Sequence, residues 1–167
     1  GFLTKPIRAE RLVASVSLRA ERMRTLRHLM VRDSLTGLYN HTNCKQILEH
    51  EFLSAQRRQS PLIFAMIDID HFKRVNDQYG HAVGDQVLIG LSRLLRQRLR
   101  KSDIIGRYGG EEFVVVLPDT NIQDAHALLD ALRQGFSSIQ FFGQGKSFHV
   151  TFSCGLASST DIHSASD

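Results

Sequence analysis

The chain of 167 residues is 42% hydrophobic and 23% charged, which suits one folded domain with a short extension. Its apolar runs fall far short of the roughly 20 residues that a membrane span needs, and residues 1–6 lack the basic-then-apolar order of a secretory signal. Residues 1–32 carry eight Lys or Arg against two Glu, whereas residues 33–167 carry 13 basic and 15 acidic residues. Because the net charge of +4 therefore belongs to the N-terminal segment, we expect no nucleic-acid partner.

A long helix is predicted near the N-terminus, over residues 8–32, which contain no Gly or Pro. Six positions in it are spaced by 4, 3, 4, 3 and 4 residues, a heptad pattern that one arginine interrupts. We expect a two-stranded coiled coil, and the alternative is an amphipathic helix lying on its own domain. The six positions are Leu12, Val16, Arg19, Met23, Leu26 and Met30.

The next elements are a turn, a helix and a strand. Asp33 or Ser34 is suited to capping and Gly37 to a turn, so the first helix ends there. A second helix is predicted over about 43–58, capped by Asn40 or Thr42. The apolar run 62–69 then predicts a buried strand.

Two further helices, over 71–79 and 81–100, precede a hairpin with strands 104–108 and 111–117. Gly109-Gly110 predicts a tight turn between these strands, because glycine tolerates a positive φ. A helix over about 122–135 follows, capped by Asn121 or Asp119. We expect an exposed loop at 143–146 and a final strand over 148–156.

Strands interleaved with helices, together with one antiparallel hairpin, predict an α/β fold of the α+β kind, with a mixed central sheet. The order of elements matches a ferredoxin-like βαββαβ core flanked by helices. Cys44 and Cys154 lie far apart with no Cys-x-x-Cys pair, which favours reduced thiols in a cytoplasmic protein.

Acidic side chains stand at the ends of two of the predicted strands. Asp68 and Asp70 close the run 62–69, and Glu111 and Glu112 open the run that follows Gly110. Core strands seldom carry unpaired acids, so these positions indicate a shared site for a hard divalent cation. The alternative for each acid alone is a solvated strand end.

With these motifs in place, the chain resembles a GGDEF domain, the catalytic module of diguanylate cyclases, over about residues 31–158. The signature occupies residues 107–113, and its third letter is Asp or Glu in the family, so Glu111 fits. The other matching motifs are residues 33–40 (Asp-Ser-Leu-Thr-Gly-Leu-Tyr-Asn), 68–77 (Asp-Ile-Asp-His-Phe-Lys-Arg-Val-Asn-Asp), 80–85 (Gly-His-Ala-Val-Gly-Asp) and 150–155 (Val-Thr-Phe-Ser-Cys-Gly).

The resemblance implies a palm-like fold, as in nucleotidyl cyclases, and condensation of two GTP molecules into cyclic di-GMP and pyrophosphate. Each of two antiparallel domains in a homodimer would carry one GTP, and each 3′-hydroxyl would attack the other's α-phosphate. Two Mg²⁺ ions per site are implied, with Mn²⁺ as a substitute. Their ligands by this resemblance are Asp68, the Ile69 carbonyl and Glu111, with Glu112 as a further ligand or the base.

The resemblance also implies nucleotide-binding residues. Asn76 and Asp85 match the guanine readers, since an amide and a carboxylate complement the edge of guanine. Phe72 and Lys73 match positions beside the phosphates, and His81 either joins them or only braces its helix. The alternatives are ordinary structural roles: a helix C-cap for Asn76, a first-turn acid for Asp85 and a surface lysine for Lys73.

Arg100 and Asp103 match the family's RxxD site, where the product binds and inhibits, and a basic helix end is the alternative. Residues 1–7 resemble the tail of a receiver domain, so we divide the chain into that tail, a signalling helix over 8–32 and a catalytic domain over 33–167. His41 departs from the family, which usually has Arg there. Family members usually continue past the last strand with another helix and a Lys/Arg segment, so we leave open whether residues 1–167 alone are active.

Two rival functions remain at this stage. One is a non-catalytic receptor for cyclic di-GMP or GTP, although such receptors usually lose the signature acids that this chain keeps. The other is a DNA-binding response regulator, which the lack of a basic recognition helix in the main domain argues against.

Overall fold

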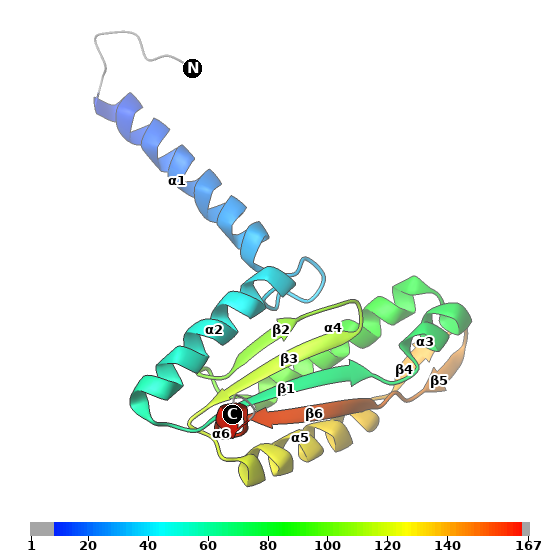
Figure 1. The fold of residues 1–167 in the computed structure, drawn as a ribbon. Helices are drawn as coiled ribbons and strands as arrows, with labels where there is room; N and C mark the ends of the chain where they lie inside the picture. Colours follow the sequence, from blue (N-terminus) through cyan, green and yellow to red (C-terminus); the bar gives the residue numbers. More distant parts are fainter. Residues whose placement is uncertain (1–8, 165–167) are drawn as a thin grey trace.

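The computed structural model describes residues 9–164, leaving aside the side chains of 27–30 and 162–164. Its centre is an antiparallel sheet with strand order β2-β3-β1-β6. The four strands are β1 (Leu62–Ile69), β2 (Ile104–Arg107), β3 (Glu112–Pro118) and β6 (Phe152–Ser158). With the helices between them, this order is the ferredoxin-like arrangement that the sequence predicts (Figure 1).

Helices cover both faces of the sheet. The helices α3 (Phe72–Tyr79), α4 (His81–Arg98) and α5 (Ile122–Ser137) contribute to the larger core, in which Ile67, Leu91 and Phe136 are fully buried. On the other face, α2 (His41–Arg58) packs Ala55 against Val114 and Val116 of β3. Asn40 caps α2 by accepting a hydrogen bond from the Asn43 amide, and Asn121 caps α5 in the same way, as predicted.

The helix α1 (Ala9–Val31) projects away from the sheet and its covering helices (Figure 1). Its heptad side chains therefore remain uncovered: Leu12, Val16, Met23 and Leu26 are 45–59% exposed. An amphipathic helix lying on its own domain would bury these side chains, so that alternative is wrong in this structure. Residues 1–7, with the predicted receiver tail, and the Met30 side chain lie outside the described part of the chain.

Most predicted bounds shift by one or two residues, and two differences change the description of an element. The helix α4 ends at Arg98 and not at residue 100, because Leu99 is extended and the Asp103 carboxylate accepts a hydrogen bond from the Arg100 amide at 2.8 Å. The predicted strand over 148–156 is two strands: β5 (Lys146–Phe148) ends before β6 begins at Phe152.

The predicted loop at 143–146 is the turn of a small hairpin that joins β4 (Phe141–Gly143) to β5. Gln144 and Gly145 have φ values of 50° and 73°, which suit a two-residue hairpin turn. After β6 the chain continues into α6 (Ser159–Ser164). Within the described residues, no helix combines the length and apolar character needed to cross a bilayer.

Candidate functional site

The centre of the candidate site lies where β1 and β3 run side by side. Their antiparallel register places Asp68 directly opposite Glu112. Directly opposed residues in such a pair have Cβ atoms about 5 Å apart on one face of the sheet, and like charges in that arrangement destabilise it. The strands therefore hold two carboxylates together at an energetic cost.

Glu111 adds a third carboxylate to this point. Its backbone carbonyl accepts a hydrogen bond of 3.1 Å from the Ile69 amide, which ties the start of β3 to the end of β1. Burial raises the pKa of Glu111, and the negative charges of Asp68 and Glu112 raise it further. The Glu111 carboxylate is thus close enough to Asp68 and Glu112 to be affected by both charges.

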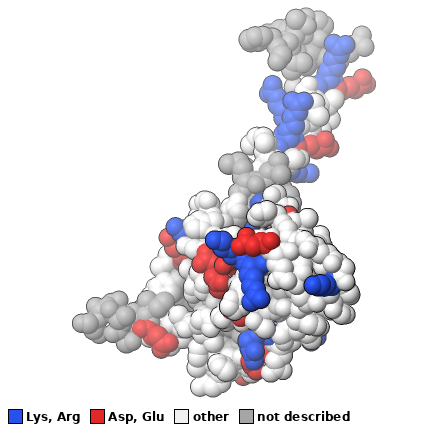
Figure 2. Space-filling model, turned by 90° about the vertical axis from the view of Figure 1, so that its right-hand side faces the viewer, with Lys and Arg blue, Asp and Glu red and all other residues white. Residues whose placement is uncertain are grey.

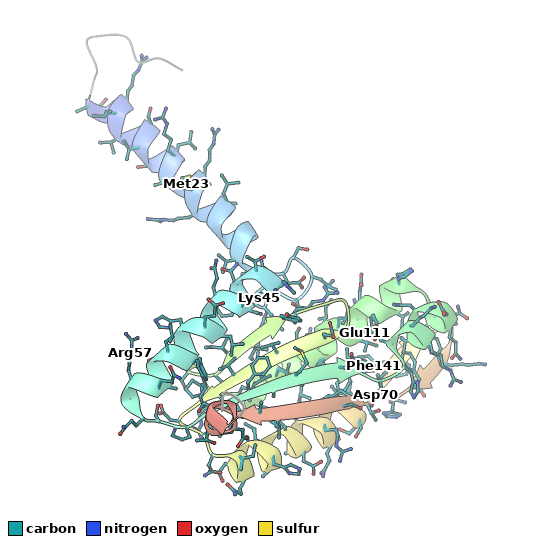
Figure 3. The ribbon with its side chains drawn as sticks, in the orientation of Figure 1. Met23, Lys45, Arg57, Asp70, Glu111 and Phe141 are labelled. Atoms are coloured by element: carbon teal, nitrogen blue, oxygen red, sulfur yellow. The ribbon has the colours of Figure 1, made fainter. Side chains whose placement is uncertain are left out.

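Asp70 is excluded from this cluster by its own hydrogen bonds. Its two carboxylate oxygens accept hydrogen bonds of 2.7 Å from the hydroxyl groups of Thr151 and Ser153 on the β6 side. Figure 3 shows Asp70 and Glu111 at the same end of the sheet. Of the two acids at this strand end, Asp70 is therefore held toward β6, and Asp68 is the one that lies opposite Glu112.

The donor set fits a hard cation. Among the described residues, no three His, Cys, Asp or Glu side chains form a ready-made metal cluster. Two or three carboxylates with the Ile69 carbonyl are nevertheless the oxygen donors that Mg²⁺ uses when phosphate oxygens or waters complete its shell. Burial and then the charges of Asp68 and Glu112 raise the pKa of Glu111, and a bound cation would relieve the repulsion between these charges.

Gly109 lies close to the Glu112 side chain. Neither Gly109 nor Gly110 has a positive φ, so the reason that the sequence analysis gave for this pair is wrong. A β-carbon at position 109 would lie 2.3 Å from Glu112 Oε2, whereas one at position 110 would meet nothing within 4 Å. The turn itself is confirmed by hydrogen bonds from the Tyr108 and Gly109 amides to the Glu112 carbonyl.

The start of α3 lies just beyond Asp70. His71 precedes α3 with φ 56° and no side-chain hydrogen bond to the first helical amides. Those amides, at Phe72 and Lys73, are therefore not capped by His71 and are suited to an anion. Phe72 itself is buried in the core, while Lys73 is exposed.

The junction of α3 and α4 holds the predicted guanine readers. A β-carbon on Gly84 would lie 1.9 Å from Asn76 Oδ1, so the Asn76 amide rests directly against the α4 backbone. Asp85 follows Gly84 and is exposed, and His81 is the first residue of α4. The sequence did not indicate that Gly84 leaves room for the Asn76 side chain, because the two residues lie on different helices and only the structure shows their contact.

The predicted product site, Arg100 and Asp103, forms a tight turn between α4 and β2. The Asp103 amide donates to the Arg100 carbonyl at 3.1 Å, and the Asp103 carboxylate accepts from the Arg100 amide. The Arg100 side chain is exposed. Figure 2 faces the opposite end of the sheet, where β1 ends and β3 begins, and there basic and acidic side chains adjoin and do not form a patch of one sign.

A family model described as "Diguanylate cyclase, GGDEF domain" matches residues 30–167. The chain is 42% identical over 130 residues to the diguanylate cyclase DgcP of Pseudomonas aeruginosa, covering 78% of this chain and 19% of DgcP. It is 36% identical over 168 residues to the response regulator PleD of Caulobacter vibrioides, covering 93% of this chain and 37% of PleD. The chain thus spans well under half the length of either relative.

Solved structures of GGDEF proteins also match the fold of this chain. The coiled coil and GGDEF domain of DgcB from Caulobacter crescentus, in complex with c-di-GMP, matches with a TM-score of 0.80 at 25% identity, covering 93% of this chain and 88% of that one. The diguanylate cyclase SiaD of Pseudomonas aeruginosa, in complex with its activator SiaC, gives a TM-score of 0.75 at 34% identity, covering 93% and 65%.

The raised pKa of Glu111 predicts how its removal changes stability. A carboxyl whose pKa is raised on folding stabilises the fold below its ordinary value of 4.5, and this contribution is lost as the pH rises through the raised value. Glu111→Gln removes the repelled charge and should raise Tm at pH 7 by roughly 1–3 °C, because solvent screens a half-exposed group. The gain should vanish near pH 4, and thermal unfolding across pH measures both.

The same thermal unfolding experiment, repeated with Mg²⁺, tests whether the cation binds at Glu111. Millimolar Mg²⁺ should raise the Tm of the wild type and not that of Glu111→Gln, because a ligand that binds only the folded state stabilises it. Glu49→Gln, at an exposed position on α2, is the matched control and should respond as the wild type does. Equal stabilisation of all three proteins by Mg²⁺ would place the cation elsewhere.

Proposed function

The chain belongs to the GGDEF domain family of diguanylate cyclases, and on that premise we propose that the protein condenses two GTP molecules into cyclic di-GMP and pyrophosphate. The observation that carries the proposal is the register that sets Asp68 opposite Glu112, with Glu111 next to them and affected by both charges. Carboxylates that repel one another lower the stability of the fold. Their presence at one point is explained if they bind cations beside a triphosphate.

Each residue of the cluster has a distinct part in this proposal. Asp68, the Ile69 carbonyl and Glu111 would hold two Mg²⁺ ions, and Glu112 would complete the shell or accept the proton of the attacking hydroxyl. When bound, the ions neutralise triphosphate charge and make the 3′-hydroxyl a better nucleophile. In each half-reaction a 3′-oxygen to α-phosphorus bond forms and pyrophosphate leaves.

The substrate is held by residues on α3 and α4. The Asn76 amide and the Asp85 carboxylate complement the donors and acceptors of guanine, and a site with these partners would discriminate against a base that lacks the matching groups. The amides of Phe72 and Lys73, with the Lys73 charge, would bind the phosphates. His81, at the first position of α4, lies close enough in sequence to join them.

Two copies of the chain are needed for this reaction, because each domain would carry one GTP. The uncovered seam of α1 supports a homodimer, since exposed apolar side chains at heptad spacing are stabilised by burial against a second helix. A receiver domain upstream of residue 8 would then control how two catalytic domains meet. The Arg100–Asp103 turn would bind the product and inhibit the enzyme.

Product formation tests the proposal directly. The complete protein, incubated with Mg²⁺ and GTP, should release cyclic di-GMP detectable by mass spectrometry, and ATP should yield no corresponding product. Asp68→Asn should lower kcat about 10³-fold, because a charged ligand is lost where phosphate charge must be neutralised. Full activity in Asp68→Asn would defeat the assignment.

Gly84→Ala tests the guanine site in the same assay. The added methyl group must displace the Asn76 amide, so KM for GTP should rise about tenfold while the metal cluster stays intact. Gly135→Ala, on α5, is the control. Its β-carbon would meet the Leu94 side chain of α4 only at ordinary contact distances of 3.7–3.8 Å.

Disruption of the α1 seam should abolish both dimerisation and turnover. Val16→Lys places a charge in the seam and should shift the protein to its monomer mass in light scattering, with product formation reduced at least about tenfold. Ser17→Lys adds the same charge one position away, outside the heptad positions, and should leave the dimer in place. Dimers in both variants would argue for a different interface.

Arg100→Ala should relieve inhibition by the product. Its guanidinium is a planar fork suited to phosphate and guanine, so its loss should raise the inhibition constant of cyclic di-GMP about tenfold or more. Lys101→Ala, which removes the neighbouring exposed cation, serves as the control. An unchanged inhibition constant in Arg100→Ala would reject the product site.

A further inference from the structure

The end of α1 is attached to the edge of the sheet by a compact turn over residues 31–40. Within it, the Asp33 amide donates to the Leu38 carbonyl at 2.7 Å and the Asn40 amide donates to the Val31 carbonyl at 3.0 Å. Tyr39 then bridges to β2, where its carbonyl accepts a hydrogen bond of 2.8 Å from the Arg107 amide. A displacement at the end of α1 therefore reaches the outer edge of β2 through a few backbone hydrogen bonds.

Arg107, the last residue of β2, faces both this turn and the signature turn. Its Nη1 donates to Asp33 Oδ1 at 3.2 Å and Oδ2 at 3.3 Å. Its Nε and Nη2 donate to the carbonyls of Gly109 and Gly110 at 2.8–3.3 Å. One guanidinium thus joins the residue that follows α1 to the two residues that precede Glu111.

The Asp33 carboxylate is well held on its side of this link. It also accepts hydrogen bonds from the Thr36 amide at 2.8 Å and the Thr36 hydroxyl at 2.7 Å. Burial alone would raise the pKa of Asp33, but the Thr36 hydrogen bonds and the Arg107 charge outweigh it and lower the pKa. The Asp33 and Arg107 side chains are only 19% and 18% exposed, so solvent screens their ion pair less than a surface pair.

Glu111 needs such a restraint. The neighbouring negative charges repel its carboxylate. The His41 ring lies 4.2 Å from the Tyr108 ring, centroid to centroid, and holds the start of the turn. A β-carbon at Gly110 would meet nothing within 4 Å, so no side chain packs against the residue directly before Glu111. The guanidinium fixes the two carbonyls immediately before Glu111 and leaves the carboxylate itself free for other partners. Its five donors in one plane are what allow it to bind both sides at once.

From this geometry we propose that Arg107 is a positioning residue, which sets the pose of Glu111 and transmits displacements of the α1 end to the acidic cluster through Asp33. The proposal rests on the proposed function for its catalytic consequence. Its structural part, a turn whose order depends on Asp33 and Arg107, stands independently of that function.

A double-mutant cycle on the full chain tests the link. Asp33→Asn removes the ion pair but keeps an acceptor for Thr36, and Arg107→Lys keeps the charge but cannot bind both sides. Each variant should lower kcat about tenfold with KM for GTP changed less than about twofold, because a misplaced acid slows chemistry more than it weakens guanine binding. Amide hydrogen exchange in residues 108–112 should accelerate in both variants.

The double variant distinguishes a relay from two separate effects. If Asp33 acts through Arg107, the double variant should be no slower than the worse single variant. Asp130→Asn and Arg133→Lys, an exposed ion pair of 2.7 Å on α5, form the matched control cycle and should change neither kcat nor exchange at 108–112.

Three results would overturn the proposal: unchanged kcat and unchanged exchange at 108–112, multiplicative losses in the double variant, or faster exchange throughout the sheet with kcat, KM and Tm all impaired. A wild type that makes no product would reject the proposed function instead. The exchange measurement would then still decide whether Asp33 and Arg107 order the turn.

Discussion

Repulsion among Asp68, Glu111 and Glu112 is the interaction around which this end of the domain is built. Strand register forces Asp68 and Glu112 to face each other, and the hydrogen bond from the Ile69 amide to the Glu111 carbonyl brings in the third acid. The fold must therefore supply restraint from elsewhere. The pairing of β1 with β3 supplies part of it, and the Arg107 guanidinium supplies another part by binding the carbonyls of Gly109 and Gly110.

The same arrangement divides two acids that look equivalent in the sequence. Asp68 and Asp70 both stand at the end of β1, on the same side of the strand by their spacing. The hydroxyl groups of Thr151 and Ser153 occupy both oxygens of Asp70 and fasten the end of β1 to β6. Asp70 thus stabilises the platform, while Asp68 is left with its charge directed toward the cluster.

Much of the fold could be predicted from the sequence, because the apolar runs, the caps and the order of elements all agree. The bounds of β1 and the caps Asn40 and Asn121 are examples. The short hairpin of β4 and β5 was missed since three-residue strands carry no periodicity. The roles of Gly84, Gly109 and Arg107 could not be predicted either, because each depends on how close a residue from another turn or helix approaches it.

The short turn that joins α1 to the sheet affects how proteins of this kind can diversify. The helix stands clear of the sheet, and its connection passes through a turn of ten residues held by both backbone and side-chain hydrogen bonds. These hydrogen bonds are made by residues from Val31 onward. Any module that ends in a helix of matching phase can therefore be grafted onto this domain, so that evolution can exchange the sensor while the catalytic half stays the same.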